Sequence, residues 1–222
     1  MIEAIDYQNW LNKGSHDYEL CDMEDAASDI FFDGYIPSGT IQFVQKFLST
    51  YHNIHKIYPI NIPNELNNYE YLKRKVEFPY LTKGKNSFPT EKFIKSDAKI
   101  KGFTNIANSI ELEGIERFLV SDLIDIESEW RSFVFNGELV GLQNYLGNFT
   151  TIPNIGLIKK MIYQYGNCPP SYSLDVGIND TEGTFLIEVH NFFSVGTYGF
   201  SNNKYLPQMF IQSFRHLVKN KF

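Results

Sequence analysis

The segment from Glu129 to Tyr145 constrains the fold of this chain more than any other stretch. Its letters, EWRSFVFNGELVGLQNY, form two runs in which apolar and polar residues alternate on either side of Asn136-Gly137. Such alternation is typical of strands with one buried face, and an Asn-Gly pair favours a two-residue type I′ turn. The segment therefore predicts a β-hairpin.

A second hairpin is predicted nearer the C-terminus, from the apolar runs SYSLDVGI (171–178) and TFLIEVH (184–190), which NDTEG separates. Shorter strands are expected at 29–35, 53–60, 93–97 and 115–124, with a loop at 98–105. Apolar residues at helical spacing predict helices at 38–51, with Ser38 as the N-cap, at 155–165, ending before Gly166, and at 206–218. A further helix is expected at 63–75, from its N-terminal proline and its C-terminal cations.

The length and composition bound the class of protein. A chain of 222 residues suits one large domain or two packed lobes with an ample core. Its two cysteines, Cys21 and Cys168, are too few for a disulfide framework and lack zinc-site spacing. No apolar run is long enough for a membrane span, and the N-terminus does not resemble a signal peptide. We therefore expect a protein of the cytoplasm, that of the host if the protein is viral.

Charge is distributed unevenly along the chain. The formal net charge is −6, with nine acidic residues among 1–33, whereas residues 71–101 hold nine Lys or Arg against three acids. Such a basic segment is either a solvated surface or a contact for a polyanion. Nucleic-acid binding through 71–101 is a minor hypothesis, because the acidic balance argues against a surface built for that purpose.

Two carboxylates inside apolar strands are the strongest chemical signal. Asp175 and Glu188 would be costly to bury alone, and a divalent cation would remove that cost. Antiparallel pairing can bring both to one ion, with His190 on the same strand face as Glu188. Oxygen ligands favour Mg²⁺; a histidine ligand would shift the preference toward Mn²⁺ or Zn²⁺, although it could equally act from outside the ligand set.

Cations inside or beside strands form a second signal. Lys95 and Lys101 could hold a polyphosphate between them, although a strand lysine usually extends into solvent. Glu129 and Arg131 share one strand face, either as an exposed ion pair or with Arg131 stabilising a phosphoryl group in transfer. Asn144, on the returning strand, is a candidate neutral partner.

Taken in order, these residues resemble the ATP-grasp superfamily, and most of all its short members from phages and bacteria. The segments that carry the resemblance are FIKSDAKIKGF (93–103), VSDLIDIESEWRSFV (120–134), GLQNY (141–145), SLDVG (173–177) and IEVHNFFSVGTYG (187–199). The resemblance implies an α+β fold in which two α+β subdomains enclose a nucleotide cleft. We place this ATP-grasp region at 76–222, preceded by a small α/β region at 1–75.

The resemblance also implies roles for individual residues. Lys95 and Lys101 would contact ATP phosphates, and Arg131 would face the γ-phosphate and the acylphosphate formed from it. The carboxylates of Asp175 and Glu188 would hold Mg²⁺. The adenine would meet the backbone of Ser121, Asp122 and Leu123, and the ribose would meet Glu127, with Glu129 as its competitor.

One position departs from the ATP-grasp pattern. Relatives usually have Asn two residues after the metal-binding Glu, whereas this chain has His190 followed by Asn191. Either residue could be the ligand, or a second metal could be lost. The phosphate loop also has fewer glycines than many relatives.

The resemblance predicts an ATP-dependent carboxylate–amine ligase of peptide type that releases ADP and phosphate, with small-molecule or peptide substrates. The alternative is a non-catalytic ATP- or ADP-binding module that acts through a protein partner, and a homodimer is a further arrangement that the sequence leaves open.

Overall fold

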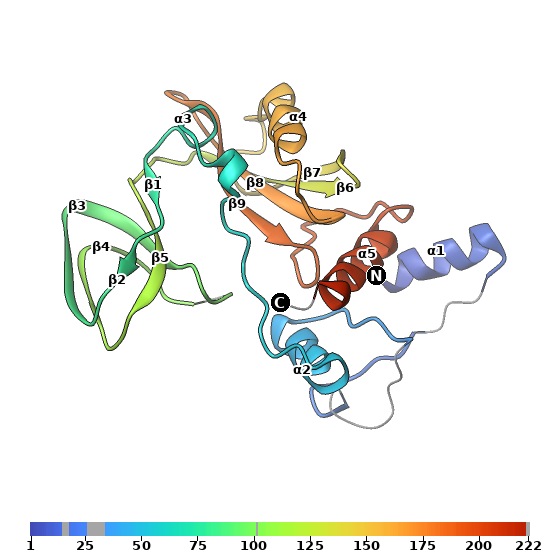
Figure 1. Ribbon diagram of the computed structural model, residues 1–222. Helices are drawn as coiled ribbons and strands as arrows, with labels where there is room; N and C mark the ends of the chain where they lie inside the picture. Colours follow the sequence, from blue (N-terminus) through green and yellow to red (C-terminus); the bar gives the residue numbers. More distant parts are fainter. Residues whose placement is uncertain (15–17, 26–33, 101, 221–222) are drawn as a thin grey trace.

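The computed structural model describes residues 1–14, 18–25, 34–100 and 102–220. It has an α+β architecture in which a small antiparallel subdomain lies beside a larger sheet with helices on both faces (Figure 1). Helices α1 and α2 and the C-terminal helix α5 gather on one side of the larger sheet, and α4 lies on the other. The predicted fold class is therefore confirmed.

The small subdomain is a sheet in the order β1-β5-β3-β4, with β2 paired to β5. A long hairpin forms most of it, because β3 and β4 pair along most of their lengths. The strand bounds are β1 Val76–Glu77, β2 Tyr80–Leu81, β3 Gly84–Ser96, β4 Thr104–Leu112 and β5 Glu116–Ser121.

The larger sheet contains both predicted hairpins and has the antiparallel order β7-β6-β8-β9. Its strands are β6 Ser128–Phe135, β7 Glu138–Gly147, β8 Ser171–Asn179 and β9 Gly183–Asn191. Asn136 and Gly137 both have positive φ, 49° and 78°, as a type I′ turn requires. The β6–β7 hairpin prediction is thus confirmed, including its turn.

Helices cover the two faces of this sheet with separate cores. On one face, α4 (Ile155–Gln164) packs with the one-turn helix α3 (Tyr69–Leu72) and the 3₁₀ turn η2 (Asn64–Leu66). On the other face, α5 (Leu206–Lys219) buries Phe210 against the sheet. Its Phe214 packs on α2 (Ile41–His52), and α1 (Ile2–Asn12) adds Ala4 to the sheet-side core.

The N-terminal third differs most from the sequence prediction. Residues 53–60 form no strand, and only Asn61 makes a bridge, to Val189. The expected helix at 63–75 is broken into η2 and α3, and Thr40 rather than Ser38 is the N-cap of α2, accepting from Phe43 N–H at 3.2 Å. The prediction of a strand at 29–35 falls largely on residues 29–33, which lie outside the described residues.

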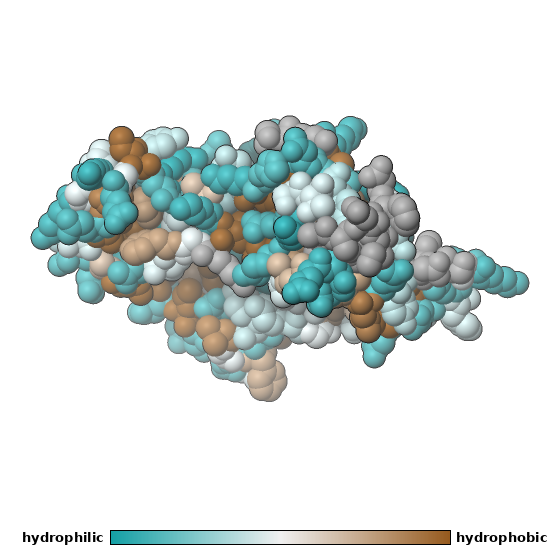
Figure 2. Space-filling model, turned by 90° about the horizontal axis from the view of Figure 1, so that it is seen from below, coloured by the Kyte–Doolittle hydropathy of each residue, from teal (hydrophilic) through white to brown (hydrophobic). Residues whose placement is uncertain are grey.

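The small subdomain also holds strands that the pattern did not predict. Most of β4 and the first half of β3 are exposed, so they lack the apolar alternation that a buried face produces. On the face shown in Figure 2, hydrophobic residues form separate patches among hydrophilic ones. No helix in the described ranges is long and apolar enough to cross a membrane.

A close approach of Phe200 to Gly141 provides a test of this packing. A Cβ at Gly141 would lie 2.3 Å from the Phe200 ring, which stacks on Phe133 at 4.2 Å between centroids. We expect Gly141→Ala to lower the free energy of unfolding by about 2 kcal/mol, because the ring must move out of a packed core. Gly114→Ala, where a Cβ meets nothing within 4 Å, should change it by less than about 0.5 kcal/mol in the same urea titration. Equal effects of the two substitutions would contradict this packing.

Candidate functional site

Strand register places three predicted site residues in one row across the larger sheet. Arg131 on β6 is opposite Asp175 on β8, and Asp175 is opposite Glu188 on β9. Opposite residues of antiparallel strands point to the same face, so the three side chains converge although up to 57 residues separate them in sequence. His190 follows on the same face of β9.

Arg131 and Asp175 form a buried two-point ion pair. Arg131 Nε and Nη2 donate to the two Asp175 oxygens at 2.8 and 2.7 Å, and the side chains are only 8% and 2% exposed. Arg131 Nη1 also donates to the carbonyl of Gly196 at 3.1 Å. Burial acts to lower the pKa of Arg131, but the hydrogen bonds and charge of Asp175 outweigh it and raise that pKa. Arg131 is therefore a fixed cation.

A second cluster joins both carboxylates to His190 and Lys95. Lys95 Nζ is paired with Glu188 Oε2, and His190 Nε2 lies 3.1 Å from Glu188 Oε1 and 3.3 Å from Asp175 Oδ2. One ligand atom from each of Asp175, Glu188 and His190 lies within 4.8 Å of the others. The cluster is thus compact enough for one cation.

The electrostatics of this cluster favour ionised groups. Burial alone would raise the pKa of Glu188, but the hydrogen bond and charge of His190, together with Lys95, lower it to about 2. Burial would likewise lower the pKa of His190, but its hydrogen bonds to Asp175 and Glu188 raise it to about 9. His190 is therefore an imidazolium at neutral pH and supplies positive charge between the two carboxylates.

Two tyrosines, absent from the sequence prediction, enclose Arg131. Tyr145 and Tyr198 stack with ring centroids 4.9 Å apart, and the Arg131 guanidinium lies 5.6 and 5.0 Å from their centroids. The Tyr145 hydroxyl donates to Glu129 Oε2 at 2.6 Å, and burial with the nearby Asp175 raises its pKa. Glu129 is thus engaged at the arginine rather than free beside the linking segment. The Gly-x-Tyr-Gly spacing was the one available signal for Tyr198.

The segment that links the two subdomains is held by cations from the basic stretch. Arg74 Nε donates to Ser121 Oγ at 2.9 Å, and its Nη1 donates to the carbonyls of Leu72 and Leu186. No described carboxylate pairs with Arg74, and burial lowers its pKa to about 10. Sequence reasoning missed Arg74 because nothing distinguishes it from its neighbours in the basic run.

The backbone at the predicted adenine position is partly occupied. Asp122 N–H donates to Lys75 O, its carbonyl accepts from Ser121 Oγ, and its carboxylate pairs with Lys92. That hydrogen bond from Lys92 lowers the pKa of Asp122. Within the described ranges, no hydrogen bond engages the N–H or C=O of Leu123, which lies next along the chain and is 47% exposed. Of the three predicted residues, Leu123 keeps its backbone groups available.

A buried asparagine joins the N-terminal region to this cleft. Asn61 is 1% exposed, accepts from Val189 N–H at 2.6 Å, and donates through Nδ2 to Asp97 Oδ1 at 2.7 Å. Asp97 follows β3 and also pairs with Arg117 at 3.0 Å. Asn61 therefore ties β9, which carries Glu188, to the loop that begins at Asp97.

Three predicted residues lie away from the charge cluster. Asn144 donates to Ser128 Oγ and to the Glu129 and Leu146 carbonyls at 3.0–3.1 Å, and it is opposite Trp130 rather than Arg131. Asn191 donates to the carbonyl of Tyr58 at 3.1 Å, so His190 is the one beside the carboxylates. Glu127 accepts from Thr151 Oγ1 at 3.2 Å. Lys101 lies outside the described residues.

The family comparison agrees with this arrangement. Two subdomains with a cluster of cations and carboxylates define an ATP-grasp type of protein, and a family model of the ATP-grasp domain matches residues 71–208. The chain belongs to this ATP-grasp domain family, which is family 2 of its clade. ATP-grasp domains of this superfamily generally bind ATP and Mg²⁺, and the ligases among them place this chain at the family level with ATP-dependent ligases.

Structural comparisons find more distant similarity. Cdc123 from Schizosaccharomyces pombe, truncated at its C-terminus, aligns at 18% identity and a TM-score of 0.27, covering 35% of this chain and 33% of that one. D-alanine–D-alanine ligase from Bacillus anthracis, complexed with ATP, aligns at 11% and 0.40, covering 64% and 61%. A RimK-domain ATP-grasp protein from Sphaerobacter thermophilus aligns at 17% and 0.34, covering 56% and 51%. The chain thus spans between a third and three fifths of these structures. No curated protein matches its sequence.

The raised pKa of His190 predicts a pH dependence of stability. A histidine with a folded pKa near 9 and an unfolded value near 6.5 contributes fully below pH 6.5, and this contribution is lost as the pH rises through 9. We expect the free energy of unfolding to fall by about 1 kcal/mol from pH 6.5 to 9.5, a value reduced by the 31% exposure of the side chain.

Urea titrations at both pH values would measure this fall. His190→Gln keeps the size of the side chain but cannot titrate, so it should remove most of the fall. His216→Gln is a matched control, because burial lowers rather than raises the pKa of His216. A wild-type stability that rises over this range would contradict the ionised cluster.

Proposed function

We propose that the chain is an ATP-dependent ligase that joins a carboxylate to an amine through an acylphosphate. The observation that carries the proposal is the convergence of Lys95, Arg131 and His190 on Asp175 and Glu188 beside the linking segment. Three cations around two carboxylates leave excess positive charge, which suits a polyphosphate. The comparisons support ligase chemistry at the family level.

The residues of the cluster fit a magnesium ion by their chemistry. Asp175 and Glu188 offer carboxylate oxygens, the ligands that Mg²⁺ prefers, while a His190 ligand would favour Mn²⁺. When bound, the metal would neutralise charge on the ATP phosphates. His190 can be a ligand only after it loses its proton, and Glu188 is free to bind only after Lys95 releases it. We assign Asp175 and Glu188 as the metal-binding pair, with His190 as the third group.

Each cation has a separate task in this proposal. Lys95 exchanges its partner, Glu188, for a phosphate oxygen of ATP, so the ion pair prepares the lysine for its ligand. Arg131 keeps its position through Asp175, and the three hydrogen bonds it makes leave two of its five N–H groups for the phosphoryl group in transfer. Because Tyr145 and Tyr198 hold the guanidinium on its two sides, Arg131 needs little reorganisation during the reaction.

Products of the reaction test the chemistry. Purified protein with MgATP, a panel of carboxylates and a panel of amines should release ADP and phosphate in equal amounts and form an amide. Phosphorylation of the carboxylate at the γ-phosphate requires these products. Release of AMP and pyrophosphate would overturn the proposed mechanism.

Lys95→Met tests the assignment of the phosphate site. The substitution keeps the length of the side chain but removes the charge-assisted bond, so we expect the KM for ATP to rise about tenfold or more. Lys85→Met is the matched control, because Lys85 is exposed on the same strand and far along it from the cleft. An unchanged KM in Lys95→Met, with circular dichroism as for wild type, would show that the nucleotide binds elsewhere.

The alternative function is a nucleotide-binding module without catalysis. The ion pairs of Asp175 and Glu188 favour it, because both carboxylates already have cationic partners. Such a module would gain thermal stability from MgATP, since a ligand that binds the native state raises its apparent stability. Stabilisation with no ADP formed under any substrate combination would decide for this alternative.

A further inference from the structure

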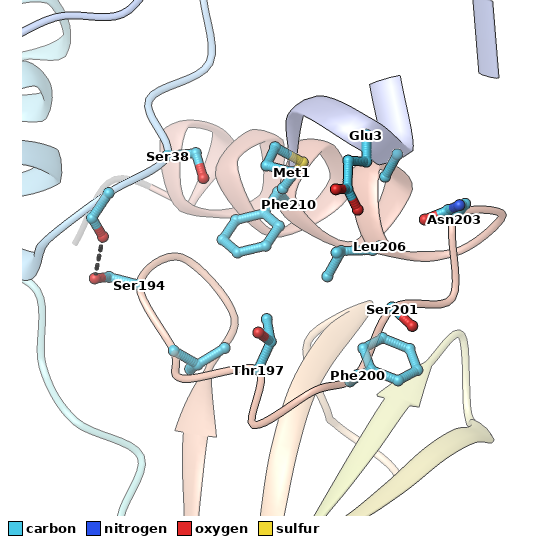
Figure 3. Close-up of a pocket in the computed structure, with 13 residues that line it drawn as sticks. Met1, Glu3, Ser38, Ser194, Thr197, Phe200, Ser201, Asn203, Leu206 and Phe210 are labelled. Atoms are coloured by element: carbon cyan, nitrogen blue, oxygen red, sulfur yellow. Dashed lines mark hydrogen bonds between the residues drawn. The ribbon is translucent and has the colours of Figure 1, made fainter. Parts of the chain in front are cut away.

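A cavity lies beside the loop that follows β9, outside the charge cluster. Its volume is about 290 Å³, and it is enclosed by this loop, the start of α5 and helix α1 (Figure 3). The apolar part of its wall includes Ala4, Phe200, Leu206 and Phe210. Its polar part consists of Glu3, Ser38, Ser194, Thr197, Ser201 and Asn203. Much of this lining precedes residue 71, outside the segment that matches the family model.

The loop connects the cavity to Arg131. Val195 and Thr197 line the cavity, while the carbonyl of Gly196 between them accepts from Arg131 Nη1. Phe200 lines the cavity and stacks on Phe133, two residues from Arg131 on the same face of β6. The cavity therefore adjoins the arginine on the same face of the sheet, with one stretch of loop between them.

The charge of the lining selects among ligands. Glu3 is the one charged side chain among the lining residues, and no ion pair or hydrogen bond joins its carboxylate to another described residue. Figure 3 shows this side chain extending from α1 toward the loop. A phosphate or carboxylate would meet a like charge here, whereas an ammonium would gain an ion pair and hydroxyl acceptors. The cavity thus disfavours both ATP and the carboxylate substrate.

We propose that this cavity binds the amine substrate of the ligation, and that this substrate is a small diamine. The inference rests on the proposed function for its link to ligation. An ammonium held by Glu3 has no lone pair and cannot attack an acyl carbon, so a second, uncharged amino group must be the nucleophile. That nitrogen forms the amide bond and gives up a proton to solvent, while the acyl carbon–oxygen bond breaks and phosphate leaves with the electron pair.

The size and the apolar wall suit such a ligand. At about 30 Å³ for each water-sized group, the cavity holds roughly ten non-hydrogen atoms. An alkyl chain of four or five carbons would pack on Phe210 and Leu206, with one end at Glu3 and the other directed along the loop toward Arg131. The N-terminal residues would then determine which amine is used, while residues of the matched segment carry the phosphoryl chemistry.

Binding without ATP tests the cavity independently of catalysis. Butylamine, butanol and butyrate have similar shapes but carry a positive, zero and negative charge, and 1,4-diaminobutane adds the second nitrogen. In ¹H–¹⁵N correlation spectra, we expect both amines to shift the amide signals of Gly39 and Gly196, butanol to bind more weakly and butyrate to leave them unchanged. Binding of butyrate as tight as that of butylamine would overturn the inference.

Two variants and a control give the residue-level test. Glu3→Gln should raise the Kd of 1,4-diaminobutane about threefold, a modest factor because the carboxylate is exposed. Thr197→Val keeps the shape of the side chain and should weaken binding as well. Asp6→Asn removes an exposed carboxylate of the same helix that does not line the cavity, and it should leave the Kd unchanged. Equal Kd values for Glu3→Gln and wild type would refute the assignment.

Activity separates this inference from the proposed function. If 1,4-diaminobutane supports ADP release, Glu3→Gln should raise its KM and leave the KM for ATP unchanged. ADP release with another amine and an unaltered KM in Glu3→Gln would refute the cavity alone. Amine binding that depends on Glu3, with no ADP formed from any substrate combination, would refute the ligase function and leave the cation site standing.

Discussion

The ion pair between Arg131 and Asp175 is the interaction on which the rest of the site depends. Both side chains are nearly inaccessible to water, so each needs the other: removing one partner of a buried pair typically costs about 3–5 kcal/mol. The pair forms because β6 and β8 meet in one register, and β9 adds Glu188 in the same row. A shift of one residue would turn these charges to the opposite face, into the core that α4 covers.

Around this pair, the structure arranges cations from both subdomains. Lys95 reaches Glu188 from the small sheet, and Asn61 ties β9 to Asp97 beside the end of β3. Arg74 joins the linking segment to β9 through Ser121 and Leu186. The cleft is therefore closed by polar contacts between segments that are distant in sequence. Such contacts can exchange for a ligand more readily than an apolar interface, because a polyphosphate offers the same cations new acceptors.

The C-terminal helix connects the cleft to the N-terminal third. Helix α5 packs on the sheet through Phe210 and on α2 through Phe214, so the N-terminal helices are held against the face that carries Arg131. The loop before α5 contributes Gly196 to the arginine and Thr197 to the adjoining cavity. Family-level chemistry and chain-specific recognition thus meet in one loop, whose two sides face different ligands.

Much of the fold and part of the site could be predicted from the sequence. The alternation around Asn136-Gly137 determined a hairpin, and carboxylates inside apolar strands identified Asp175 and Glu188 as groups that need cationic partners. Local patterns did not reveal the exposed half of the β3–β4 hairpin, the roles of Arg74 and Tyr145, or the irregular path of residues 53–60. Those features depend on contacts between distant segments. The sequence by itself determined which charges would be buried; only the tertiary structure decided their partners, because strand register and the meeting of two subdomains set which cation lies within reach of which carboxylate.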